Sequence, residues 1–467
     1  MKKFFVSTGL AAISAAGLQS VSAQGLDIAS PKSWSISGTL RGFYDDNYDI
    51  SGTKKGSWGA EVSPSISVNI PLAQTDFGMR YYYGLYYYND RDSIHVNPFD
   101  QSHQFEVWLD HAFNTAWKLN ATDHFAIGQE PELLQPDPLG GQASPIRHNG
   151  NNISNHAHIS LDTQWSTHFS TSLSYGNEYF DYDNSGASVA PGGFIVLGAT
   201  GLSPSTPGGF GFQSFNGASG ASLSGLLDRV EQSVGLDGNW TFNPETVLSA
   251  GYGYGMVNYI GNEPVAIFNY IDTDFNPRNF VYHSRDRDSR SHNGHVGINR
   301  QLTANISLAI SAGVSFTDSY NDPIVHTTSI SPNATASLSY TYTPGSYIQL
   351  GVSHGQSATD QVRPAADGSI TQYQHFTTVY GDINHRFSEK LIGTLIGRFS
   401  YSSFEGGEAA SGNATPDYDY NVGLNFTYQF SRHFSADGGY NFDDLISGLT
   451  GRGYVRNRVY LGLTASY

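Results

Sequence analysis

The stretch RNRVYLGLTASY, Arg456 to Tyr467, decides how the rest of the chain is interpreted. Every second residue from Val459 to Tyr467 is apolar, and the residues between them are polar or small. A strict period of two is that of a β-strand with one face in an apolar medium and the other in water or against small side chains. The chain ends on an aromatic residue with no charged tail. We therefore expect an amphipathic closing strand.

Composition supports strands over helices. The 467 residues are 39% hydrophobic with a mean hydropathy of -0.34, which is too polar for a helical membrane protein. Gly (52), Tyr (30) and Phe (27) are abundant, and only 14% of residues are charged, which suits alternating strands and Gly-rich loops. The net charge of -17 argues against a nucleic-acid partner. The absence of cysteine excludes disulfides and thiolate metal sites. A soluble β-sandwich or propeller is the alternative at this stage.

The N-terminus has the three parts of a secretory signal. Lys2 and Lys3 precede the apolar run Phe4–Leu18, and small residues lead to a cleavage site after Ala23. A membrane-anchoring helix is the alternative, but the run is short and interrupted by polar residues and glycine. We expect a signal peptide at residues 1–23, a short periplasmic leader at 24–33 and a β-barrel domain at 34–467.

The alternation of the last strand recurs along the chain, with bulky apolar residues on one parity and Ser, Thr, Asn, Gly, Asp or Arg on the other. Strands are predicted at Trp34–Asp46, Trp58–Leu72, Phe77–Tyr87, His103–Leu119, Ala157–Trp165, Val230–Phe242, Leu248–Met256, Ile306–Phe316, Ala334–Tyr342, Ile348–Val352, Tyr373–Phe387, Leu391–Tyr401 and Tyr418–Phe430.

A short repeat marks the turns between strands: a bulky apolar residue, then a turn residue, then another apolar residue. It occurs at Leu72-Ala73, Leu119-Asn120, Trp165-Ser166, Phe242-Asn243, Leu302-Thr303, Tyr342-Thr343, Phe387-Ser388 and Phe430-Ser431. The turn residue is Ser, Thr or Asn in all but the first, and such side chains hydrogen-bond the local backbone. The spacing of the repeats predicts units of two strands, one long loop and one short turn.

These units predict an all-β fold. We expect a transmembrane antiparallel up-and-down β-barrel of about 16–18 strands, with short periplasmic turns and long extracellular loops. The longest connections, Tyr182–Leu226 and Gly261–Ser291, are expected to be inserted loops. Closure lets so long a sheet avoid exposed edges in lipid. The polar face is predicted to line a water-filled interior, which is too wide for side chains to fill.

Two stretches resemble a known family. Gln129-Glu130-Pro131-Glu132-Leu133-Leu134 follows a predicted strand, and His385-Arg386-Phe387-Ser388 lies at a short turn. With the repeat, they make the chain similar to bacterial outer-membrane β-barrel porins, closest to the putative β-barrel porin type 2 family. The resemblance implies a Gram-negative outer-membrane location and diffusion through a pore. The last strand likewise resembles the assembly signal of such barrels, which comprises Val459, Leu461, Leu463 and Tyr467 here.

Charged residues on the polar parity are the candidate pore-lining side chains. The acids are Glu61, Glu106, Asp110, Glu231, Asp237, Asp382, Asp419 and Asp437, and the bases are Arg80, Lys118, Arg229, Arg386, Arg456 and Arg458. Because acids and bases are nearly balanced, ion selectivity is expected to be mild. The alternative is that some of these residues pair across strands as structural ladders and never meet solute.

The third outer loop, Glu130–Gly150, is the candidate constriction. Its prolines Pro131, Pro136, Pro138 and Pro145 stiffen it and keep it from pairing as a strand. Folded inward, its acids Glu130, Glu132 and Asp137 and its base Arg147 would set a transverse field across the channel. The competing candidate is Tyr182–Leu226, whose segment Phe194–Leu197 is apolar.

No catalytic or cofactor site is expected. The G-x-S-x-G pattern at Gly351–Gly355 lies in an alternating strand, whereas a nucleophile elbow needs a strand-to-helix turn. We expect a porin for passive diffusion of small hydrophilic solutes. The alternative is a β-barrel anchor or a component of a surface or export assembly. Expected partners are outer-membrane lipid and lipopolysaccharide, the barrel-assembly machinery and periplasmic chaperones. Homo-oligomerisation is left open.

Overall fold

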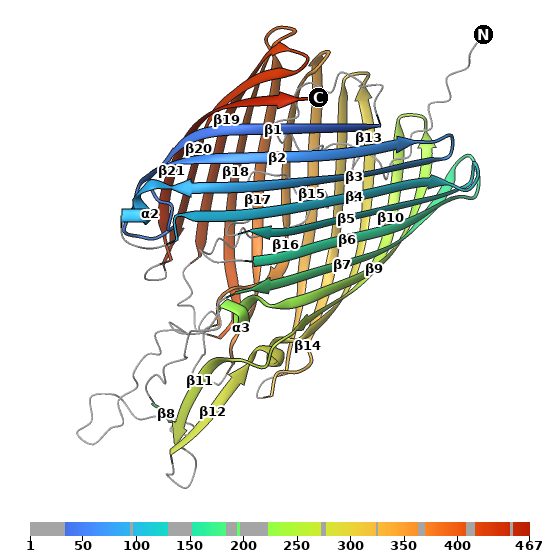
Figure 1. Ribbon diagram of the computed structural model, residues 1–467. Coiled ribbons are helices and arrows are strands. Elements are labelled where there is room, and N and C mark those ends of the chain that lie inside the picture. The colour runs from blue at the N-terminus through green and yellow to red at the C-terminus, as the bar shows by residue number, and fades with distance from the viewer. Residues whose placement is uncertain are drawn as a thin grey trace.

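The chain forms a closed antiparallel barrel of 18 strands (Figure 1). The computed structural model describes residues 33–93, 97–128, 152–183, 194–196, 223–271, 277–323, 326–362, 369–407, 416–448 and 452–467. The barrel strands are β1 (Trp34–Asp45), β2 (Ser57–Pro71), β3 (Thr75–Tyr88), β4 (Phe99–Ala112), β5 (Trp117–Gly128), β6 (Asn152–Gln164), β7 (Phe169–Tyr182), β9 (Arg229–Asn243), β10 (Thr246–Tyr259), β13 (Ser289–Thr303), β14 (Ile306–Ser319), β15 (Thr327–Thr343), β16 (Ser346–Ala358), β17 (Thr371–Arg386), β18 (Leu391–Gly406), β19 (Asp417–Ser431), β20 (Phe434–Ser447) and β21 (Tyr454–Ser466). The predicted fold class is confirmed, and the number of barrel strands lies at the top of the expected range.

Each barrel strand pairs with the next barrel strand along the chain, and β21 closes the barrel on β1. β21 runs antiparallel to β1, with Leu463 opposite Leu40. Beyond this ladder, the amide of Tyr467 donates to the Ile36 carbonyl (2.9 Å) and the amide of Ile36 donates to the Tyr467 carbonyl (3.2 Å). The Tyr467 ring lies 5.7 Å from that of Trp34. The closing strand thus pairs through its final residue, so no sheet edge is left open.

Bulky apolar side chains cover the outside of the barrel, as the alternation predicts. Trp58, Val62 and Ile66 on β2 are exposed, as are Leu461 and Leu463 on β21. A water-soluble barrel would bury such residues in its core, whereas here the polar parity faces inward. No helix in the described part of the chain is long and apolar enough to cross a membrane.

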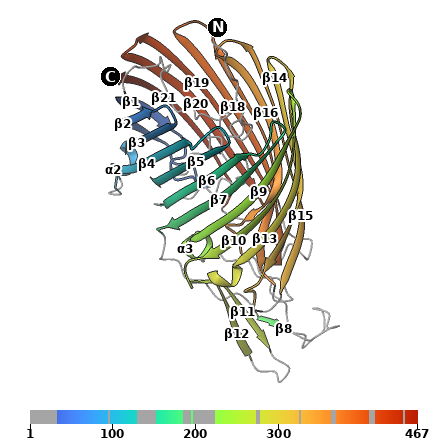
Figure 2. The same ribbon diagram turned by 90° about the vertical axis from the view of Figure 1, so that its right-hand side faces the viewer.

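The two ends of the barrel differ (Figures 1 and 2). Eight tight connections form the short-turn end, whereas the other, long-loop end carries helices α2 (Asn89–Ser93) and α3 (Leu223–Leu227), the 3₁₀ helix η1 (Ser284–Arg287) and a second sheet. That sheet contains β8 (Phe194–Val196), β11 (Pro264–Ile271) and β12 (Pro277–His283). The predicted inserted connection Gly261–Ser291 contains the β11–β12 hairpin. Within Tyr182–Leu226, the described residues include β8 and most of α3.

Side-chain hydrogen bonds open six of the eight short turns. Ser166 Oγ, for example, accepts from the amide of Phe169 (3.1 Å), and Ser388 Oγ accepts from that of Leu391 (3.1 Å). Asn114, Asn243, Thr303 and Ser431 act in the same way. The β15–β16 turn instead uses Pro344-Gly345, where Gly345 has a φ of +80° that favours glycine.

One predicted turn is misplaced. Leu119 and Asn120 lie within β5, and the turn between β4 and β5 occupies residues 113–116. Asn114 opens it by accepting from the amides of Ala116 (2.7 Å) and Trp117 (3.0 Å). The predicted strand His103–Leu119 is therefore two strands. The error arose because the alternation of β4 continues in β5, so periodicity alone does not reveal the reversal.

Candidate solute pathway

The seam between β21 and β1 carries a network of charged side chains on its inner face. Arg41 donates from Nε to Asp437 Oδ2 on β20 (2.7 Å) and from Nη1 to Glu61 Oε1 on β2 (3.2 Å). Its side chain passes over Gly462 of β21, where an added Cβ would collide with it. The network therefore spans four neighbouring strands and ties the closing pair together.

Glu61 is the centre of this network. Its Oε1 also accepts from Ser63 Oγ (2.6 Å) and Tyr82 OH (3.0 Å), and its Oε2 lies 3.9 Å from Arg458 Nη2. The Arg458 guanidinium in turn lies 4.4 Å from the centre of the Phe43 ring. Because Glu61 is only 3% exposed, little of its carboxylate meets the fluid inside the barrel.

A second buried ion pair lies at the long-loop end of the same seam. Arg456 Nε donates to Asp45 Oδ2 (2.9 Å), and Asp45 Oδ1 also accepts from the amide of Asn47 (3.0 Å). Neither charged side chain is exposed to a significant extent. Four of the residues predicted to line the pore therefore lie in ion pairs at the seam: Glu61, Asp437, Arg456 and Arg458. Their contacts favour the structural ladder that the sequence left open, and contact with solute stays a prediction.

Other predicted residues form pairs away from the seam. Arg80 Nη1 on β3 lies 3.3 Å from Glu106 Oε2 on β4, and both side chains keep more than a quarter of their surface exposed. Arg229 Nε donates to Glu231 Oε1 within β9 (2.6 Å). Arg229 also lies 4.1 Å from the Phe180 ring centre. The side chains of Arg80, Glu106 and Glu231 are more exposed than those in the ion pairs at the seam.

Asp237 on β9 reaches across a strand to its partner. Its Oδ1 lies 2.8 Å from His295 Nε2 on β13, and Gly251 of the intervening β10 lies between them. An added Cβ at Gly251 would collide with both side chains. Asp110 on β4 lies opposite Asp76 on β3, so two carboxylates face each other there.

The remaining predicted residues are dispersed. Asp382 on β17 accepts from Tyr347 OH (3.1 Å), and Asp419 on β19 accepts from Asn421 Nδ2 (3.4 Å). Arg386 lies at the short-turn end, where its Nη2 reaches the Glu389 carbonyl (3.5 Å). The structure therefore does not gather all the predicted residues into one site.

The inner wall has a sector with almost no charge. Strands β10, β13, β14, β15 and β16 present small and hydroxyl-bearing residues inward, including Ser249, Gly251, Ser291, Asn293, Ser311, Ser315, Thr335, Ser337, Ser339 and Ser353. Among the described residues of these strands, His295 is the only histidine or charged side chain on that face. Charged residues therefore gather on the wall that runs from β17 through the seam to β9.

An apolar cluster closes part of the long-loop end. It joins α3, β11, β12 and the described residues between β16 and β17, 359–362 and 369–370, and its buried members are Leu226, Leu227, Val265, Ala266, Tyr282, Val362 and Ile370. Arg287 of η1 is buried beside it and donates to the carbonyls of Leu226 (2.9 Å) and Thr359 (2.5 Å). Burial lowers the pKa of Arg287.

A second set of contacts holds the segment after β16 from the opposite side. Arg452, which precedes β21, pairs with Asp360 and donates from Nε to Asp417 Oδ2 (2.8 Å). We call Arg452, Asp360 and Asp417 the mouth latch. The segment after β16 therefore contacts residues that precede β9 and β21, each five strands away around the barrel. Points so far apart on the wall can meet only over the opening, so residues 359–362 lie over the long-loop end.

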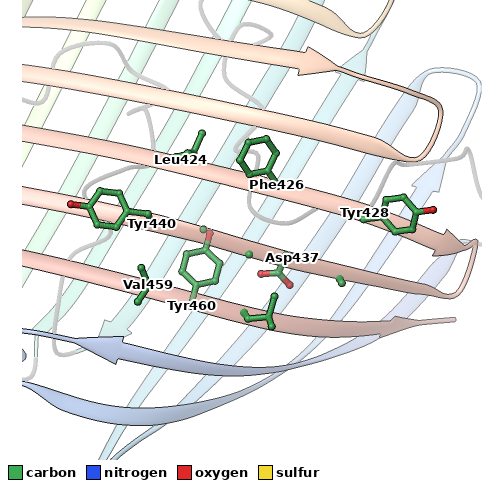
Figure 3. Close-up of a pocket in the computed structure, with 11 residues that line it drawn as sticks. Leu424, Phe426, Tyr428, Asp437, Tyr440, Val459 and Tyr460 are labelled. Carbon is green, nitrogen blue, oxygen red and sulfur yellow. The ribbon is translucent and has the colours of Figure 1, made fainter.

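A shallow groove of about 540 Å³ lies over β19, β20 and β21 (Figure 3). Its lining includes Phe426, Tyr428 and Leu461, which are exposed on the outer face, and Gly438, which leaves a notch among them. The groove therefore belongs mainly to the apolar outer surface and not to the interior.

Several predicted features lie outside the described residues: the signal peptide and leader, and the loop with Glu130, Glu132, Asp137 and Arg147. Gly351–Gly355 lies wholly within β16, so it has no strand-to-helix elbow. Among the described residues, no three histidine or acidic side chains converge as metal ligands.

Sequence reasoning missed Arg41, Asp45, Arg287 and Arg452. Arg41 and Asp45 occupy the polar parity of the first predicted strand, so the alternation was sufficient to find them. Arg287 and Arg452 lie outside the barrel strands and had no such signal. Their partners are distant in sequence, and only the folded long-loop end brings them together.

Comparison with known proteins agrees with this architecture. Residues 264–467 match the family "Putative beta-barrel porin 2". The family resemblance expected from the sequence is thereby confirmed, and the chain is a porin-like barrel of the outer-membrane type. No curated protein matches the chain.

Similar solved structures include Acinetobacter baumannii OccAB2, with 12% identity, a TM-score of 0.42 and coverage of 93% of this chain and 98% of that one. Pseudomonas aeruginosa OpdQ has 10% identity, a TM-score of 0.39 and coverage of 93% and 97%. The siderophore receptor PirA from Pseudomonas aeruginosa has 9% identity, a TM-score of 0.40 and coverage of 92% and 80%. With TM-scores below 0.5, these likenesses support no conclusion about function.

Proposed function

We propose that this chain forms a water-filled channel through which small hydrophilic solutes diffuse passively. The observation that carries the proposal is the closed barrel of 18 strands with an apolar outside and a polar inside. Interiors of barrels this wide are not filled by their own side chains. The hydroxyl-rich sector from β10 to β16 offers hydrogen bonds without strong charge, which suits neutral solutes. The family match over residues 264–467 supports the same function.

The proposal includes a location and an orientation. The signal peptide would export the chain, and the barrel would insert in a Gram-negative outer membrane with its short turns in the periplasm. The exposed apolar bands would contact lipid and the lower part of lipopolysaccharide. The barrel-assembly machinery and periplasmic chaperones would deliver the chain. No enzymatic activity is proposed.

Single-channel recording in a planar lipid bilayer tests the function. Purified, refolded protein should produce discrete conductance steps that scale with salt concentration. Liposome swelling with small sugars should then show a cutoff by solute size. Correctly folded, heat-modifiable protein that produces neither signal would overturn the proposal.

A second candidate is a barrel that anchors a surface or export assembly. The observation that favours it is the long-loop end, where the β8–β11–β12 sheet projects beyond the barrel (Figure 1). Absence of conductance, together with loss of a surface complex on deletion of the β11–β12 hairpin, would support this candidate.

A further inference from the structure

An unbroken row of ionisable side chains crosses the inner wall. Six adjacent strands, β3, β4, β5, β6, β7 and β9, each contribute one residue directly opposite the next. The members are Arg80, Glu106, His124, His156, Glu178 and Glu231. We call this set the lumenal row. Since strands lie about 4.8 Å apart, it extends for about 24 Å around the wall.

Direct contacts link the members of the row. Besides the Arg80–Glu106 pair, His156 Nδ1 lies 3.6 Å from Glu178 Oε2. The rings of His124 and His156 are 6.3 Å apart, and Arg229 pairs with Glu231 at the far end. Glu178 and Glu231 lie directly opposite each other, so two carboxylates repel each other at this end of the row. The two histidines therefore lie between acidic groups on both sides.

The row is accessible from the interior, unlike the seam. The side chains of Glu106 and His156 are 29% and 30% exposed, whereas that of Glu61 is 4% exposed. Glu178, at 17%, is less exposed than Arg80, Glu106, His156 and Glu231. An ion that passes this wall can therefore approach the row within hydrogen-bonding range.

The charge of the row depends on the two histidines. The charge count includes Arg229, because it pairs with Glu231 at the end of the row. With both histidines neutral, Arg80 and Arg229 are outnumbered by the three glutamates, so the row and Arg229 together have one excess negative charge. With both histidines protonated, the row and Arg229 together have one excess positive charge. An ordinary histidine changes its charge near pH 6.5, and no other side chain does so in this range without perturbation.

The neighbours of each histidine are defined. His124 faces Glu106 on β4 and His156 on β6. His156 faces His124, Glu178 on β7 and the Phe180 ring, which lies 5.4 Å away. Asp123 projects to the opposite face of β5, where it accepts from Asn155 Nδ2 (2.7 Å). The carboxylates of Glu106 and Glu178 thus lie on the outer sides of the histidine pair, and each imidazole lies beside the other.

We propose that the lumenal row determines which ions pass, with cations preferred while His124 and His156 are neutral and anions preferred once both are protonated. The ligands are small inorganic ions and small amines or carboxylates. This inference rests on the proposed channel function and names the residues that give it charge selectivity.

The test is the reversal potential in a planar bilayer under a KCl gradient at pH 8 and pH 5. We expect the ratio of K⁺ to Cl⁻ permeability to be above one at pH 8 and below one at pH 5. In the double variant His124→Gln and His156→Gln, this change should be lost. Each single variant should show part of the change, so the test does not depend on folding of the double variant.

Two controls separate the row from other effects. His103→Gln and His292→Gln alter histidines on the outer face, where they contact Tyr81 and Tyr252, and should leave the pH response intact. Glu178→Gln should lower the permeability ratio at pH 8. An unchanged pH response in the double variant, or a pH-independent permeability ratio in the wild type, would refute the proposed role of the lumenal row in ion selectivity. Neither result would contradict the proposed channel function. Absence of any conductance would overturn both proposals.

Discussion

At the scale of the residue, Asp45 and Arg456 illustrate how a buried ion pair supports barrel closure. Asp45→Asn would leave the Arg456 guanidinium buried without its full counter-charge, at a cost of about 3 kcal/mol. We expect this variant to unfold at a lower temperature in heat-modifiability gels.

Lys54→Gln is the matched control for Asp45→Asn. It breaks the pair of Lys54 with Asp46, in which the lysine side chain is 45% exposed, and should leave the unfolding temperature unchanged. Equal losses in both variants would contradict the role of the buried pair.

Asp228 predicts a pH dependence at the long-loop end. Burial raises its pKa to about 7, and the carboxylates of Asp181 and Glu263 act in the same direction. The unfolded chain releases this proton near its ordinary pKa of 3.8, so local stability should fall as the pH rises from about 4 to 7. Because the side chain is partly exposed, we expect this loss of local stability to be roughly 1 kcal/mol.

Asp228→Asn should remove this dependence while its side-chain oxygen still accepts from the Tyr182 amide (2.8 Å in the native chain). Hydrogen exchange at Tyr182 and at Ile260, whose amide donates to the Asp228 carbonyl, should be slower in the variant at pH 8. The two proteins should match at pH 5. Faster exchange in the variant at pH 8 would refute the pKa assignment.

At the scale of the element, β21 is the strand that closes the barrel on β1. Removing Tyr467 deletes two backbone hydrogen bonds to Ile36 and the ring contact with Trp34, and Leu463→Asp places a charge on the apolar face. Both variants should fail to assemble and be degraded in cells. Leu463→Val is the conservative control, and normal heat-modifiable folding of the two disruptive variants would argue against an assembly signal.

The mouth latch predicts where the channel is narrowed. Arg452→Gln should release Asp360 and Asp417 and free the segment after β16, so conductance should rise and protease should cut residues 359–370 faster. Lys55→Gln, in an exposed pair near the same end, should change neither property. If conductance instead rises only on deletion of Gln135–Ser144, the Pro-rich loop is the constriction and the latch is not.

At the scale of the whole molecule, the asymmetry of the two ends predicts an orientation in the membrane. A protease added to intact cells should cut within the long connection Tyr182–Leu226 and spare the short turn Phe387–Leu391. Cell lysis should expose no new site at that turn while Ser388 keeps it closed by hydrogen bonds. Cutting at 387–391 in intact cells would invert the proposed topology.

Much of the architecture was predictable because strand periodicity and turn chemistry are local. Ser166 and Ser388 signal their turns through hydrogen bonds to residues two or three positions ahead. Local signals failed where they were weak or misleading. β7, β13 and β20 carry Gly, Thr, Asn or His on the outer face, so their apolar alternation is incomplete. Only the spacing between the predicted turns indicated that strands were present there.

The sequence by itself determined that this chain makes an amphipathic barrel of about this size, because the parity of each strand is set by residues one and two positions away. Only the tertiary structure decided which inward charges meet. The partners of Arg41, Arg287 and Arg452 lie tens to hundreds of residues away along the chain. The lumenal row likewise depends on strand register, since a shift of one residue at any pairing would turn its member toward lipid. Register is set by the closed set of backbone ladders, and no single segment contains that information.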